Sequence, residues 1–188
     1  MSNNSRSWRK HVGVPVLMAA LAIAAQATVP RGWYLHGSNP KDFDAGVDLD
    51  QPYQGHASAF LKSKELRANG FGTLMQTVKA EQYLGRRVRL SGLVKSEEVT
   101  GWAGLWMRVD KGTTVVAFDN MQNRAIKGTT GWKRYDIELD VPKDATGISF
   151  GILLDGPGEV WLNGTRFDAL DAGEGIVPET PVNLDFTE

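Results

Sequence analysis

The stretch that decides the fold runs from residue 132 to residue 141 and reads WKRYDIELDV. Its apolar side chains alternate with charged ones, in the order Arg134, Tyr135, Asp136, Ile137, Glu138, Leu139, Asp140, Val141. Successive side chains of a β-strand point to opposite faces of a sheet, so this pattern predicts a strand with one buried and one wet face.

The same period of two continues through most of the chain from residue 43 onward, and helical periodicity is nearly absent. Further strands are predicted over residues 43–48, 57–61, 71–79, 88–94, 102–109, 113–119, 148–154 and 159–167. Short helical turns fit only residues 63–68 and 80–84. Many short strands separated by turns are typical of all-β proteins, and we predict an antiparallel two-sheet β-sandwich.

The composition of the 188 residues excludes several chemistries. The chain has no cysteine, so it can form no disulfide framework, thiol nucleophile, zinc–thiolate centre or iron–sulfur site. Its three histidines leave little for metal binding or general-base catalysis. A formal net charge of -1 makes nucleic acid a poor expected partner.

The first residues have the order of an export signal. Arg6, Arg9 and Lys10 precede an apolar stretch over residues 12–25, and Ala25-Gln26-Ala27 is a small-x-small cleavage site. The apolar stretch is shorter than the roughly 20 residues that span a bilayer, so we expect a cleaved signal peptide and no membrane span afterwards. The expected location is secreted or periplasmic.

These features divide the chain into three parts. We expect a signal peptide at residues 1–27, a β-sandwich domain at residues 28–170 and a loose tail at residues 171–188. Removing the leader's three basic residues from the 21 of the chain leaves 18 basic against 22 acidic residues, a net charge of -4. An acidic exported domain of this kind has no attraction to DNA or to anionic lipid.

Several segments carry a family likeness. Residues 71–76, FGTLMQ, form an apolar strand ending in Gln, and residues 83–92, YLGRRVRLSG, follow with Tyr-x-Gly-Arg and a basic-apolar strand. Residues 101–110, 118–121 and 151–161 continue the pattern, which covers about residues 32–168. The chain resembles the galactose-binding-like jelly-roll superfamily, and more narrowly a carbohydrate-binding-module-like bacterial domain also found appended to regulators and peptidases. The resemblance implies jelly-roll topology and a role in binding sugars or proteins.

A candidate binding face lies on the predicted strand 102–109. Trp102, Trp106 and Arg108 share one face of that strand, whereas Leu105 and Met107 take the other. An exposed tryptophan beside a guanidinium can stack on a sugar ring and bond its hydroxyls. The alternative is that both tryptophans pack in the core, the commoner place for this residue.

Polar residues from neighbouring segments could complete this face. The candidates are Gln76, Asp119, Asn120 and Gln122. We expect a non-catalytic binding module for carbohydrate or a glycan-bearing surface. Two alternatives stay open: a polysaccharide hydrolase or lyase with paired carboxylates such as Asp119 and Glu138, and a protein-interaction module.

No cofactor is expected. The acids Asp42, Asp44, Asp48 and Asp50 could attract calcium, but their alternation with apolar residues fits the wet face of a strand better. Many members of the resembling family carry an acid after the last tryptophan, near a structural calcium. Here Leu162, Asn163 and Gly164 follow Trp161, so calcium is not favoured. His36 and His56 lack the context of any catalytic motif, so no catalytic residue is assigned.

Overall fold

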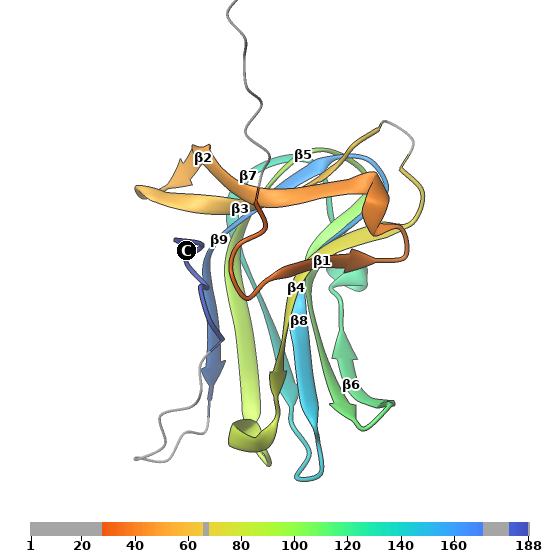
Figure 1. Cartoon of the computed structure of the whole chain (residues 1–188), viewed down its shortest axis with the longest axis vertical. Coiled ribbons are helices and arrows are strands. Elements are labelled where there is room, and N and C mark those ends of the chain that lie inside the picture. Colours follow the sequence, from red (N-terminus) through yellow and green to blue (C-terminus); the bar gives the residue numbers. More distant parts are fainter. Residues whose placement is uncertain (1–27, 66–67, 171–180, 188) are drawn as a thin grey trace, which may run out of the picture.

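Nine strands and three short 3-10 helices make up the part of the chain that the computed structural model describes, residues 28–65, 68–170 and 181–187. The strands are β1 (Tyr34–Gly37), β2 (Phe43–Tyr53), β3 (His56–Ser63), β4 (Phe71–Lys79), β5 (Arg87–Lys111), β6 (Thr114–Asp119), β7 (Ile126–Asp140), β8 (Gly147–Asp155) and β9 (Glu159–Ala169). The helices are η1 (Pro40–Asp42), η2 (Glu81–Tyr83) and η3 (Gln122–Arg124). The predicted all-β fold is confirmed (Figure 1).

Most predicted strands are present, with two differences. Residues 88–94 and 102–109 belong to one continuous strand, β5, of 25 residues. The strand β1, only four residues long, was not predicted from periodicity. Gln54 and Gly55, which both have positive φ, join β2 to β3 as a tight hairpin.

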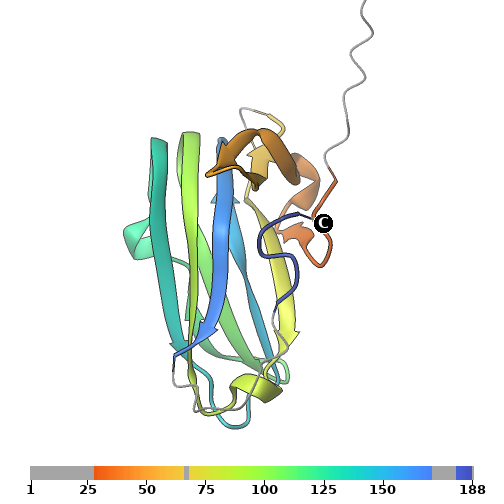
Figure 2. The same ribbon diagram turned by 90° about the vertical axis from the view of Figure 1, so that its left-hand side faces the viewer.

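Strand β5 belongs to both layers of the sandwich. Its first half pairs with β7 and β9, and β9 continues through β3 to β2. Its second half pairs with β8 and β6, and β8 continues through β4 to β1. All these pairs are antiparallel. Because β5 takes part in both layers, a single curled sheet forms two layers that face each other (Figure 2).

The core lies between the two layers. Leu74, Leu105 and Phe150 extend into it from β4, β5 and β8. Leu61 and Ile137 extend into it from the other layer, on β3 and β7. Strand β7 thus buries Ile137 and leaves the charged residues of the 132–141 stretch outward, as its alternation predicts.

The chain end differs from the loose tail expected over residues 171–188. Residues 181–187 lie beside the start of the described chain (Figure 2). Phe186 is buried, and its ring centroid is 5.3 Å from that of Trp33. The indole of Trp33 donates a hydrogen bond to the carbonyl of Asn183 at 3.0 Å. Residues 171–180 and the expected signal peptide lie outside the described residues. Within the described part, no helix has the length and apolarity needed to cross a membrane.

A close approach between β8 and β4 allows a direct test of the packing. A Cβ on Gly151 would lie 2.2 Å from the carbonyl oxygen of Leu74, a backbone atom that cannot move alone. We expect Gly151→Ala to lower the free energy of unfolding by about 1–3 kcal/mol, the usual cost of overpacking. The measurement is the midpoint of urea denaturation.

The matched control is Gly131→Ala on β7, where a Cβ would meet no atom within 4 Å. Because glycine inside a strand costs conformational entropy, this variant should match or slightly exceed the wild type in stability. Equal midpoints for the two variants would contradict the close approach.

Candidate functional site

A groove of about 460 Å³ crosses the outer face of the layer formed by β1, β4, β8, the second half of β5 and β6. The core lies on the opposite face of the same strands. The groove is lined by Tyr34, His36, Gly37, Ser38, Phe71, Thr73, Met75, Thr77, Trp106, Arg108, Phe118, Ser149 and Leu153.

The register of the strands explains the groove. Met75 of β4 and Trp106 of β5 are both cross-strand partners of Gly151 on β8. Gly151 has no side chain, so the two larger residues can pack over it. Together with Leu153 they form a small apolar cluster on the outer face, separate from the main core. This cluster is the floor of the groove.

The structure brings Trp106 and Arg108 into the groove. Trp106 is only 7% exposed, and its indole N–H donates to the hydroxyl of Thr73 at 2.7 Å. Thr73 in turn donates to the carbonyl of Ile152. Trp102 is half-buried against the floor and donates its indole N–H to Asp155. Both tryptophans therefore support the groove more than they offer a free stacking surface.

Two aromatic side chains that the sequence analysis did not select offer more surface. Tyr34 on β1 is 40% exposed and Phe118 on β6 is 53% exposed, at opposite edges of the groove layer. Phe118 is the cross-strand partner of Arg108, so the two side chains lie on the same face of the sheet. That pairing would have identified Phe118, had the hairpin register been known from sequence.

A chain of hydroxyl groups runs across three strands of the groove. The phenol of Tyr34 lies 2.6 Å from the Thr77 hydroxyl, which lies 2.9 Å from the Ser149 hydroxyl. Ser149 is the cross-strand partner of Arg108, so the line of hydroxyls ends at the residue paired with Arg108. The groove thus combines an apolar floor with a line of groups that can both donate and accept hydrogen bonds.

Gln76 lies on the other face of β4 and does not reach the groove. It is buried, and its amide N–H donates to the carbonyl of Val182 at 2.6 Å. Gln76 therefore fastens the C-terminal segment. The parity of β4 requires this, because Phe71, Thr73 and Met75 occupy the groove face at odd positions.

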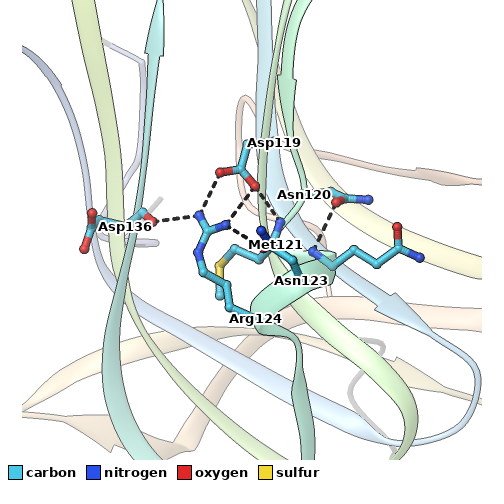
Figure 3. A network of polar contacts seen from close by, with 7 residues as sticks. Asp119, Asn120, Met121, Asn123, Arg124 and Asp136 are labelled. Carbon is cyan, nitrogen blue, oxygen red and sulfur yellow. Dashed lines mark hydrogen bonds and ion pairs between the residues drawn. The ribbon is translucent and has the colours of Figure 1, made fainter.

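Asp119, Asn120 and Gln122 gather at the end of β6, beside the groove and not within it. They line a shallow depression that shares Phe118 with the groove. Asp119 faces the Arg124 guanidinium at 2.8 Å and accepts the N–H of Met121, as Figure 3 shows. The Asn120 side chain accepts the N–H of Gln122. These groups shape the turn that leads into η3.

Partial burial of Asp119 alone would raise its pKa, but its contacts act more strongly. Hydrogen bonds from Arg124 and Met121, together with the charge of Arg124, hold the pKa of the Asp119 carboxyl below its usual value. Its suggested partner Glu138 lies on β7 in an ion pair with Arg89. Neither carboxylate lines the groove, so the pairing considered for a hydrolase or lyase does not face it.

The Asp48 carboxylate of the acidic run on β2 is engaged in hydrogen bonds within the chain. One oxygen of Asp48 accepts the N–H groups of Asp50 and Gln51, and the other accepts the indole N–H of Trp161 at 2.8 Å. No group of three or more histidine, aspartate or glutamate side chains placed to hold a metal occurs in the described residues. His36 lines the groove, whereas His56 lies on β3 in the other layer.

Comparison with curated proteins finds a sequence relative. No family model matches the chain. The uncharacterized HTH-type transcriptional regulator YbfP of Bacillus subtilis is 45% identical over 168 residues. The match covers 84% of this chain but 57% of the regulator, so the chain spans little more than half the length of this curated relative.

Solved structures share the fold at low identity. The xylan-binding CBM22-1 domain of Paenibacillus barcinonensis Xyn10C is 17% identical, with a TM-score of 0.55 over 79% of this chain and 92% of that domain. The cyclase Fisc from Fischerella sp. TAU, solved with an indole compound, is 15% identical, with a TM-score of 0.57 over 78% and 89%. These likenesses confirm the all-β jelly-roll sandwich.

The burial of Trp106 predicts the effect of removing it. Trp106→Ala should lower the free energy of unfolding by about 3–5 kcal/mol, because it opens a cavity in the floor and leaves Thr73 without its donor. The half-buried Trp102→Ala should cost clearly less. Chemical denaturation of both variants measures the difference, and an unchanged stability for Trp106→Ala would show that the floor is not packed around it.

Proposed function

We propose that this chain is a carbohydrate-binding module whose ligand lies in the groove. The observation that carries the proposal is the position of Tyr34 and Phe118, two exposed aromatic rings at opposite edges of one apolar floor. Aromatic faces stack on the apolar faces of sugar rings. Two separated rings suit a ligand of more than one sugar unit.

The polar groups beside these rings support the same ligand class. A sugar hydroxyl that leaves water needs a new hydrogen-bond partner, otherwise burial is costly. The hydroxyls of Tyr34, Thr77 and Ser149 and the imidazole of His36 line the groove and can supply such partners. None of the described residues forms a hydrogen bond to the His36 ring, so this ring is available to a ligand.

The solved structures suggest the first ligand to test. Several neighbours of the same fold are CBM22 modules, among them the xylan-binding domain described above. The regulator relative suggests no ligand, because it is uncharacterized and the match covers only 57% of it. We therefore propose a β-linked polysaccharide such as xylan as the ligand class.

We also propose that the domain acts outside the cytoplasm. The basis is the order of the leader: basic residues, an apolar stretch and the Ala25-Gln26-Ala27 site. A glycan-binding role would fit an extracellular or periplasmic place, where polysaccharides occur.

The binding proposal predicts that the two exposed rings contribute affinity without contributing much stability. Phe118→Ala and Tyr34→Ala should each weaken binding to soluble xylan about tenfold, as expected if stacking on one ring contributes about 1–3 kcal/mol. Isothermal titration calorimetry measures the affinity, and thermal melts should shift by a few degrees at most.

The control is Leu49→Ala, which removes an exposed apolar side chain on β2, outside the groove. It should leave the affinity unchanged. Xylan affinity that is the same in all three variants would place the binding surface elsewhere. No binding to any member of a polysaccharide panel would refute the carbohydrate proposal itself.

The export proposal predicts a mature protein that begins at Thr28. N-terminal sequencing of the protein purified from its native host identifies the first residue of the mature protein. Ala27→Leu should block cleavage, since signal peptidase requires a small residue there. Recovery of Met1 or Ser2 as the N-terminal residue of the wild type would contradict the proposal.

A further inference from the structure

Arg108 is the only formally charged residue among those that line the groove. No aspartate or glutamate takes part in the lining, although the whole chain has 22 acidic residues against 21 basic ones. The lining of the groove therefore carries one positive and no negative formal charge, and the carboxylate that pairs with this charge, Asp110, lies outside the lining. A positive group at a groove can attract anionic groups to it.

The geometry of Arg108 leaves part of its guanidinium open. Its Nε donates to a carboxylate oxygen of Asp110 at 3.0 Å, and the side chain is 41% exposed. Neither terminal amino group of Arg108 makes a hydrogen bond with any residue in the described part of the chain. The contact with Asp110 holds the guanidinium in place while the two Nη groups stay available.

The nearby carboxylates already have partners. Asp110 accepts from Arg108, and Asp155 accepts from the indole of Trp102. The hydroxyls of the groove can bond a neutral sugar both as donors and as acceptors. Here the charged group is a donor alone, and its natural complement is an acceptor that carries negative charge.

We propose that the groove selects an acidic glycan, one in which a uronate carboxylate accepts hydrogen bonds from the two Nη groups of Arg108. This inference rests on the proposed carbohydrate-binding function. Arg108 lies between Ser149 and Phe118 in the strand register, so a uronic acid ring stacked on Phe118 would lie beside Arg108. The planar fork of arginine matches the two oxygens of a carboxylate.

The test compares one polymer with and without its carboxylates. Glucuronoxylan is titrated into the full chain, next to the same polymer after reduction of its uronate carboxyls to primary alcohols. The native polymer should bind about tenfold more tightly or better, the usual contribution of hydrogen bonds to a charged group. The ratio should shrink in 0.5 M NaCl, because salt screens an exposed charge pair.

Variants assign the preference to Arg108. Arg108→Gln should reduce the ratio of the two affinities to about one, because it removes the charge that distinguishes the native from the reduced polymer. Arg87→Gln is the matched control: it removes the same charge from the same strand, outside the groove, where Arg87 pairs with Asp140. It should keep the wild-type ratio.

A second variant is used if the first one does not fold. If Arg108→Gln fails to fold because Asp110 loses its partner, Arg108→Gln combined with Asp110→Asn removes both charges and answers the same question. Equal affinity of the wild type for native and reduced polymer would overturn the inference and leave the carbohydrate proposal intact. A preference that survives in the Arg108 variant would overturn it too. If neither polymer binds and no neutral glycan binds, the carbohydrate proposal itself is refuted.

Discussion

The shared strand β5 sets the arrangement of the whole domain. Its 25 residues supply backbone hydrogen-bonding groups to four neighbours, β7 and β9 in one layer and β8 and β6 in the other. Because buried N–H and C=O groups must be paired, the path of this strand fixes where the other strands can lie. A shift of β5 by one residue would exchange Leu105 and Met107 with Trp106 and Arg108, so core and groove are specified together.

Periodicity predicted the strands well wherever one face is buried and the other wet. It failed where that contrast is weak. Residues 95–101 are mostly polar, and the pairing with β7 has register shifts between Val94 and Val99. The sequence therefore predicted two strands where the structure has one. The segment 181–187 has no periodicity at all. It is held by the buried Phe186, by Leu184 packed against the core, and by hydrogen bonds from Gln76 and Trp33 to its backbone. Tertiary contacts of this kind have no local signature.

The candidate site was predicted in part for a similar reason. Parity along one strand correctly put Trp106 and Arg108 on one face, because alternation is a local property. It could not show that Met75 and Leu153 from other strands bury the indole. It also could not relate the face of β4 to that of β5, which is why Gln76 was assigned to the wrong side. Tyr34 and Phe118 lie at the edges of the layer, and edges are defined only by strand order.

The contact between Trp33 and Asn183 has a consequence for how this domain can be joined to others. The two residues are 150 positions apart in sequence, yet a single hydrogen bond of 3.0 Å connects them. Start and end of the folded unit therefore lie next to each other, the condition under which a domain tolerates circular permutation or insertion into a loop of another protein. A new pair of termini could be opened at the Gln54–Gly55 hairpin turn, which lies outside the groove, while a short linker closes the old ones. The fold is thus almost a closed ring, and a cut at that turn removes no residue from the lining of the groove.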